Sequence, residues 1–230
     1  MQLSLTDYVP KIYFKIVHYS ILGIKIMGEY LDFGVLAEDN IRTLSVPQAV
    51  SKKPLCVILV GIPESGKTFL TQKLSEKFPL TILSEEAMTA FLSPRATIFK
   101  RSALEVFQLA TKTIERLIKM GKCCIYDANI KSPEQRSLIK TVVEQSGGSY
   151  LLIHSSCPKE LCYGRLQKHN LEVARGEKKG FIMDKDYFEY EVVSTRAPVV
   201  DEHHLVYNCE NQESLFPIIS AAERRLKESK

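Results

Sequence analysis

Residues 55–68 read LCVILVGIPESGKT, an apolar run followed at once by the complete pattern G-x-x-x-x-G-K-[ST]. The apolar run predicts a buried strand, and residues 69–74, FLTQKL, continue as a helix. A strand that turns through such a loop into a helix aims consecutive backbone N–H groups, and the positive end of the helix, at one point. A phosphate fits that point, so we expect a nucleoside triphosphate as ligand.

The loop and the residue after it form the expected nucleotide site. Lys67 adds a positive charge beside the phosphates, and Thr68 offers a hydroxyl to Mg²⁺. The alternative, a plain strand–turn–helix corner with a solvated lysine, leaves the loop glycines unexplained. The predicted nucleotide-binding residues are Gly61, Pro63, Glu64, Ser65, Gly66, Lys67, Thr68 and Phe69.

Length and composition predict one α/β domain with an appendage, since the chain has 230 residues and is 45% apolar. The net charge of +4 permits an anionic substrate without requiring nucleic acid. No secretory signal or membrane-spanning stretch is visible, which favours a cytoplasmic protein without a membrane partner. The six cysteines do not have the spacing of metal ligands. We expect them to be buried thiols in a reducing compartment; they are Cys56, Cys123, Cys124, Cys157, Cys162 and Cys209.

The chain changes character near residue 53. Stretches rich in β-branched and aromatic residues at 13–17, 21–27 and 30–36 predict two or three strands, and residues 51–54, SKKP, indicate a linker. We therefore expect a small β appendage over residues 1–53 and a nucleotide domain over 54–230. The appendage either adds to the core or forms a contact between copies in a homo-oligomer.

From residue 55 onward, strand-like runs alternate with helical patterns. The runs are 55–60, 80–83, 122–127, 149–154 and 204–208, and helices are expected near 100–120, from 133 to 147, after Pro158 and over 214–229. This alternation is typical of parallel sheets with helices on both faces. The predicted fold is a three-layer α/β/α phosphate-loop domain with five parallel strands.

Two acidic positions follow predicted strands. Residues 122–127, KCCIYD, end in Asp127, and an acid at a strand end beside the phosphate loop can help to hold Mg²⁺; the alternative is a loop cap. Residues 81–84, TILS, lead into Glu85 and Glu86, either of which could be a general base for a hydroxyl group. An acidic first helical turn is the other interpretation of this pair.

Phosphoryl transfer also needs positive charge at the transferring group. Arg165 lies on the helix predicted after the fourth strand, and residues 175–180, RGEKKG, predict a mobile lid. We expect Arg165 to serve this role, whereas Lys168, Lys178 and Lys179 fit a solvated surface.

About two thirds of the chain, residues 55–208, resembles the polynucleotide-kinase-like branch of phosphate-loop kinases and, more distantly, zeta toxins and gluconate kinases. The segments that carry the resemblance are 60–68 VGIPESGKT, 125–129 IYDAN followed by Arg136, 157–160 CPKE leading to Arg165, and 196–198 RAP with Glu202. The resemblance implies a sheet with the phosphate-loop strand in the middle, ATP as donor, Mg²⁺ and a hydroxyl acceptor.

The resemblance also assigns roles by position. Lys67 and Thr68 would grip the phosphates and the metal, Asp127 would join Thr68 at the metal, and Arg165 would be the lid arginine. Glu85, Asn129 and Arg136 would lie near the substrate. Glu64 stands where small kinases usually have glycine, although heterotrimeric G-protein α subunits share the Glu-Ser-Gly-Lys string.

The motif after the second strand departs from the family pattern Ser-x-Asp-x-x-Arg. Here Glu86 replaces the aspartate that acts as base, and Thr89 replaces the arginine near the acceptor. The first hypothesis is an ATP- and Mg²⁺-dependent kinase for a 5′-hydroxyl polynucleotide end. Thr89 in place of the arginine weakens the case for a polynucleotide acceptor. Two alternatives therefore stay open: a kinase for a sugar, nucleoside or nucleotide sugar, and a nucleotide-binding switch or regulatory ATPase.

Overall fold

The computed structural model describes residues 31–92, 103–178 and 180–227. Contacts between Cα atoms group the chain from Phe33 onward into one compact unit. The domain boundary expected near residue 53 stays a prediction. The strands expected at 13–17 and 21–27, and the oligomer contact expected from them, lie outside the described residues.

The prediction of a strand over residues 30–36 is wrong for the residues from Phe33 onward, which are helical. Phe33 begins helix α2 (Phe33–Thr43), which buries Leu36, Ala37 and Asn40 and packs against helix α5 (Ala103–Lys119). The buried positions 36, 37 and 40 recur at helical spacing, so the helical pattern extends past the segment from which we expected a strand.

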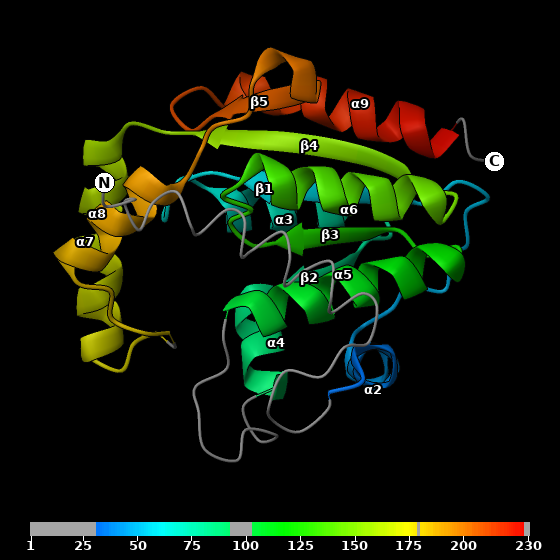
Figure 1. The fold of residues 1–230 in the computed structure, drawn as a ribbon. Coiled ribbons are helices and arrows are strands. Elements are labelled where there is room, and N and C mark those ends of the chain that lie inside the picture. Colours follow the sequence, from blue (N-terminus) through cyan, green and yellow to red (C-terminus); the bar gives the residue numbers. More distant parts are fainter. Residues whose placement is uncertain (1–30, 93–102, 179, 228–230) are drawn as a thin grey trace, which may run out of the picture. The chain divides into compact units, whose positions relative to one another are not determined.

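The sheet confirms the expected architecture. Its five strands are parallel and stand in the order β2-β3-β1-β4-β5, with the phosphate-loop strand β1 in the middle (Figure 1). Their bounds are β1 (Leu55–Val60), β2 (Thr81–Ser84), β3 (Cys124–Asp127), β4 (Ser149–Ser156) and β5 (His204–Asn208). Every residue of β1 is fully buried, as expected for a central strand covered on both faces.

Helices cover both faces of the sheet and make the three layers that we expected. Helices α5 and α6 (Pro133–Gln145) lie on one face, and α3 (Lys67–Lys77) and α9 (Leu215–Lys227) lie on the other (Figure 1). On the second face, Val57 and Ile153 of the sheet form a core with Leu70 and Ile218 of the helices. Each such apolar side chain contributes roughly 2 kcal/mol by its burial.

The remaining described elements are three helices near the carboxyl edge of the sheet and two short turns that flank β5 along the chain. They are α4 (Glu85–Leu92), α7 (Lys159–Ala174), α8 (Lys185–Ser194) and two short 3-10 turns, Val200–Glu202 and Gln212–Ser214. Helix α8 was not expected, although Asp184 caps it by accepting the Tyr187 N–H at 2.8 Å. At α6, the Ser132 capping box with Pro133 confirms the expected start.

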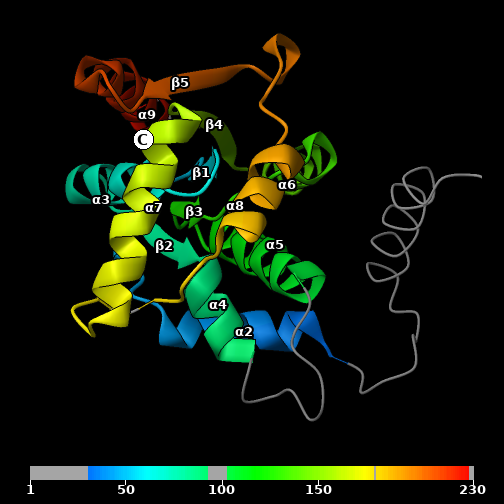
Figure 2. The same cartoon turned by 90° about the vertical axis from the view of Figure 1, so that its left-hand side faces the viewer.

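Register brings the ends of neighbouring strands to one level. Ser84 pairs with Asp127, and Ile58 pairs with Tyr126, so the last residues of β2 and β3 lie beside the end of β1. Figure 2 looks onto this carboxyl edge, which α7 and α8 flank on either side. The loop after β1 therefore meets the acidic residues after β2 and β3.

The cysteines correct the expectation of six free thiols. Cys157 and Cys209 form a disulfide, whereas Cys56, Cys123, Cys124 and Cys162 are free and buried. The register explains the pair: Ser156 lies opposite Asn208 across β4 and β5, so the next residue of each strand is also opposed. Among the described helices, none is long and apolar enough to cross a bilayer.

Candidate active site

The first glycine of the phosphate loop is required by close packing against β4. A Cβ on Gly61 would lie 2.5 Å from the Ser155 carbonyl oxygen and 2.6 Å from Ser65 Oγ, so no larger residue fits. The Ser155 hydroxyl also donates to the Ser65 carbonyl at 2.8 Å. Ser155 thus braces the loop from β4, a role that no local sequence signal indicates.

Glu64 occupies a backbone conformation that normally favours glycine. Its φ of 61° is in the left-handed region, which costs a residue with a side chain about 1 kcal/mol. The structure accommodates the side chain, with Glu64 Oε1 at 3.9 Å from His169 Nδ1 on α7. The departure from glycine at this position is therefore compatible with an intact loop.

Lys67 is held at the loop by backbone oxygens. Its Nζ donates to the carbonyls of Gly61 at 2.8 Å and Ile62 at 3.0 Å. Loss of solvation lowers the pKa of this lysine, while the nearby carboxylates of Asp127 and Glu85 act in the opposite direction. The ammonium group therefore stands between the loop and two acids, as a phosphate-binding lysine should.

Asp127 lies beside the start of α3. Loss of solvation raises the pKa of its carboxyl group, and the Thr68 hydroxyl and the Lys67 charge oppose that rise. The structure thus brings together Thr68 and Asp127, the two predicted metal ligands. A hydroxyl and a carboxylate are the oxygen donors that Mg²⁺ prefers, with water completing its shell.

The two acids after β2 point in different directions. Helix α4 begins at Glu85, and Ser84 Oγ accepts the Ala87 N–H at 3.1 Å, so Glu85 and Glu86 do form the acidic first turn. Loss of solvation and the Glu191 carboxylate raise the pKa of Glu85, while the Lys131 charge, a hydrogen bond from the Asn129 backbone N–H and the Lys67 charge lower it. Glu86, the predicted base, follows about 100° further around the helix. The structure therefore places Glu85 with the other site residues.

Asn129 ties the phosphate loop to α8. Its Oδ1 accepts the Gly61 N–H at 3.3 Å, and its Nδ2 donates to Thr195 Oγ1 at 2.7 Å. Near it, Lys131 forms an ion pair with the buried Glu191 of α8. Lys131 and Glu191 were not predicted from the sequence, because their pairing joins segments far apart in the chain.

Arg136 has a structural position, which argues against the substrate role expected for it. Its side chain is 1% exposed and donates to both carboxylate oxygens of Glu202, at 2.5 and 2.7 Å. It also donates to the carbonyls of Ile130 and Arg196, each at 3.0 Å. These bonds hold the guanidinium inside the fold and join α6 to the segment that follows α8.

Arg165 reaches the phosphate loop from α7. Its Nη1 donates to the Glu64 carbonyl at 3.1 Å and lies 3.5 Å from Cys157 Sγ. Phe69, by contrast, packs its ring on Tyr207 with 5.9 Å between ring centroids and belongs to the core. Its ring therefore contributes to packing, not to the face of the loop.

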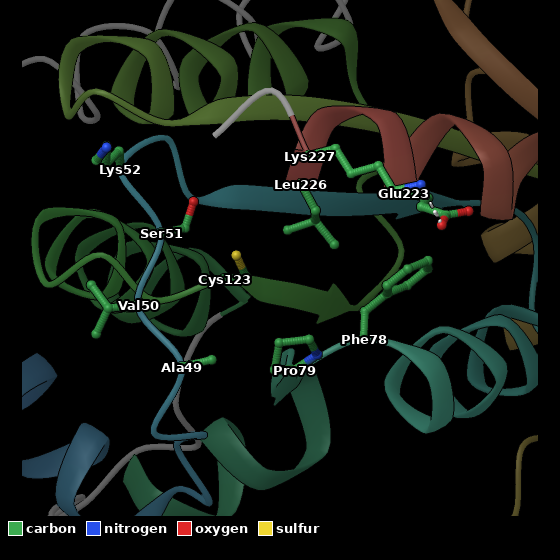
Figure 3. A pocket seen from close by; sticks show the side chains of 10 residues that line it. All are labelled: Ala49, Val50, Ser51, Lys52, Phe78, Pro79, Cys123, Glu223, Leu226 and Lys227. Atoms are coloured by element: carbon green, nitrogen blue, oxygen red, sulfur yellow. Dashed lines mark ion pairs between the residues drawn. The ribbon is translucent and has the colours of Figure 1, made fainter. Parts of the chain in front are cut away.

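A cavity of about 570 Å³ lies at the opposite edge of the sheet (Figure 3). Its lining comes from segments that precede strands β1, β2 and β3, together with the end of α9, where Lys227 pairs with Glu223 at 3.0 Å. Because the phosphate loop follows β1, this cavity is separate from the candidate active site.

Part of the chain matches a known family and a characterised enzyme. The family AAA_33, described as an AAA domain, matches residues 56–179. The bifunctional 6-phosphofructo-2-kinase/fructose-2,6-bisphosphatase 1 of Rattus norvegicus is 30% identical over 134 residues, which is 50% of this chain and 28% of that protein. The chain thus matches little more than a quarter of this relative.

Solved structures share the fold. Kti12 of Chaetomium thermophilum, in complex with ADP-AlF3, is 12% identical with a TM-score of 0.59, covering 74% of this chain and 98% of that one. A sugar kinase of Janibacter sp. is 15% identical with a TM-score of 0.51, covering 76% and 95%. The family match spans more than half of the chain, and the chain therefore belongs to the AAA_33 family of AAA domains, with a phosphate-loop kinase-like fold.

Proposed function

We propose that the chain is an ATP- and Mg²⁺-dependent phosphotransferase that moves the γ-phosphoryl group of ATP to a hydroxyl. The observation that carries this proposal is the meeting of Lys67, Asp127 and Glu85 at one edge of the sheet. The Lys67 charge acts on both carboxylates, and both act on the pKa of Lys67. A phosphate-binding cation, a metal-binding acid and a base thus stand together.

The roles follow from this arrangement. The loop N–H groups and Lys67 bind the phosphates, and Thr68 and Asp127 would hold Mg²⁺, which supplies charge neutralisation when bound. The acceptor oxygen attacks the γ-phosphorus, the bond from that phosphorus to the ADP oxygen breaks, and Glu85 takes the acceptor proton. The raised pKa of Glu85 suits a base that must accept a proton near neutral pH.

For the acceptor, we propose a small hydroxyl compound in preference to a polynucleotide end. Glu85 and Glu191 interact at the acceptor side, and the Lys131 charge there is engaged by Glu191. A polynucleotide brings closely spaced phosphates, which carboxylates repel and cationic side chains attract. The partial match to a relative named as a 6-phosphofructo-2-kinase supports a small acceptor.

A 5′-hydroxyl polynucleotide end is the second candidate. It is favoured by the segments shared with polynucleotide-kinase-like enzymes and by the net charge of +4. At position 89, where that pattern has an arginine, the Thr89 hydroxyl donates to the Glu85 carbonyl at 2.8 Å. The charge that would meet a nucleic acid phosphate is therefore missing at this position.

The test is to incubate the protein with γ-labelled ATP and Mg²⁺ and to offer sugars, nucleosides and 5′-hydroxyl oligonucleotides in parallel. We expect label in a small compound, and its loss in Lys67→Ala with folding retained. Lys73→Ala is the matched control, because Lys73 lies on the same helix and pairs at the surface with Glu76. Label in the oligonucleotide would move the acceptor to the second candidate, and ATP hydrolysis without any labelled acceptor would indicate a nucleotide switch.

A further inference from the structure

Helix α8 presents two aromatic rings to solvent on one face. Tyr187 and Tyr190 are 49% and 61% exposed, and their ring centroids lie 6.1 Å apart. They stand three residues apart, so they share a side of the helix, and Glu191 falls on the same side. An exposed aromatic pair of this kind is not needed to fill the core.

This aromatic face adjoins the charged groups of the candidate active site. The Lys131 Nζ lies 5.5 Å from the centre of the Tyr190 ring and is ion-paired with Glu191. Loss of solvation raises the pKa of Tyr187, and the carboxylates of Glu191 and Glu85 raise it further. Tyr187 is therefore near the same Glu85 that interacts with Lys67.

The position of α8 relative to the phosphate loop is set by hydrogen bonds. Asn129 bridges the Gly61 N–H and the Thr195 hydroxyl, which directly follows α8. The Arg196 N–H donates to the Lys131 carbonyl at 3.0 Å. Two hydrogen bonds thus attach Thr195 and Arg196, which follow α8, to the segment after β3. Figure 2 shows α8 beside the carboxyl edge of the sheet.

We infer that Tyr187 and Tyr190, with Glu85 beside them, form the acceptor subsite and that it takes a polyhydroxylated ring, a sugar or a cyclic polyol. This inference rests on the phosphotransferase proposed above and names its substrate class. The C–H face of such a ring packs on an aromatic side chain. Its hydroxyls donate to carboxylates, whose oxygens accept hydrogen bonds and, when ionised, carry no donor. Because Glu191 neutralises the Lys131 charge, the subsite does not require an anionic ligand.

The chain has no tryptophan, which allows a direct binding test. The variant Tyr190→Trp keeps an aromatic surface and adds a single fluorescent reporter to it. We would titrate this variant with glucose, fructose, galactose, ribose and inositol, each up to about 10 mM, ten times the upper end of ordinary KM values. A 5′-hydroxyl oligonucleotide and cyclohexanol serve as comparison probes.

We expect saturable quenching or a spectral shift with at least one sugar or polyol, weakened about tenfold or more in the double variant with Glu85→Gln. Met120→Trp is the matched control, because Met120 lies between α5 and β3 at the opposite edge of the sheet, is 50% exposed and should report no binding. No saturable change with any of the five compounds overturns the inference. An equal response from Met120→Trp, or a response to the oligonucleotide or to cyclohexanol alone, also overturns it.

Turnover separates this inference from the proposed function. With the bound compound as acceptor, Tyr190→Ala should raise the acceptor KM about tenfold and leave the KM for ATP unchanged, whereas Tyr190→Phe should behave as the wild type. Sugar binding without any phosphoryl transfer would uphold the subsite and refute the phosphotransferase. Phosphoryl transfer with an acceptor KM that Tyr190→Ala does not change would uphold the phosphotransferase and refute the subsite.

Discussion

The Arg165 guanidinium donates to the Glu64 carbonyl at 3.1 Å, so a side chain of α7 is attached directly to the phosphate loop. This contact holds an arginine beside the place where the phosphates are expected. It also explains how Glu64 persists in the left-handed backbone region, since its carbonyl is fixed from outside the loop.

Replacement of Arg165 by alanine should slow phosphoryl transfer by about 10²-fold or more, because a positioned cation at the transferring group is lost. The measurement is kcat for transfer of γ-labelled phosphate. Lys168→Ala is the control on the same helix, since Lys168 lies at the surface 3.9 Å from Glu172. Equal effects of the two substitutions would remove Arg165 from the mechanism.

The base is predicted to be Glu85, not Glu86. Glu85→Gln should reduce kcat by about 10²-fold or more, because glutamine cannot accept the acceptor proton. Glu86→Gln keeps the same helix and the same loss of charge, so it is the matched control and should retain activity. The reverse order of the two rates would restore Glu86 as the base that the family pattern indicates.

Asp127→Asn should abolish Mg²⁺-dependent transfer and yet leave Tm at pH 7 equal or higher. The folded pKa of Asp127 is raised by loss of solvation, so its contribution to stability is present below the unfolded pKa of about 3.9 and is lost as pH rises through the folded pKa. At pH 7 the ionised group therefore costs stability, which asparagine avoids. Thermal denaturation without nucleotide at pH 7 and near pH 4 measures this; a lower Tm for the variant at pH 7 would contradict it.

Glu202→Gln should lower the free energy of unfolding by about 3 kcal/mol at pH 7, because it leaves the buried Arg136 without its anion. The hydrogen bonds from Arg136 lower the pKa of Glu202, so its contribution is present above the unfolded pKa of about 4.3 and is lost as pH falls through the folded pKa. Urea denaturation should show the difference between the proteins shrinking in acid.

The control for that substitution is Glu134→Gln, whose partner Arg196 lies at 3.2 Å with both side chains more than half exposed. An exposed pair contributes at most about 1 kcal/mol. Similar losses from the two substitutions would show that Arg136 is less dependent on Glu202 than its burial indicates.

Reduction of the Cys157–Cys209 disulfide should lower the free energy of unfolding by about 2–4 kcal/mol, because the reduced chain regains conformational freedom on unfolding. Urea denaturation with and without dithiothreitol measures the change. Cys157→Ser/Cys209→Ser is the control and should be indifferent to the reductant. A wild-type curve that does not move with dithiothreitol would show that the two cysteines are unbonded in solution.

The sequence by itself determined the elements whose signals are local. The strand-like runs at 55–60 and 204–208 specify strands because their neighbours are turns and helices within a few residues. The phosphate loop and the Ser132 cap are likewise short patterns with a backbone conformation of their own. The central place of the loop strand followed from the resemblance.

Only the tertiary structure decided the features that join distant segments. Rotation about α4 selects Glu85 over Glu86, and Arg136 is buried because Glu202, far along the chain, completes its hydrogen bonds. The disulfide follows from the register of β4 and β5. Each outcome depends on which side chains meet across the fold, and spacing along the chain does not contain that information. The phosphate loop, Asp127 and Arg165 could be recognised from sequence, whereas the choice of Glu85 and the pairing of Lys131 with Glu191 required the fold.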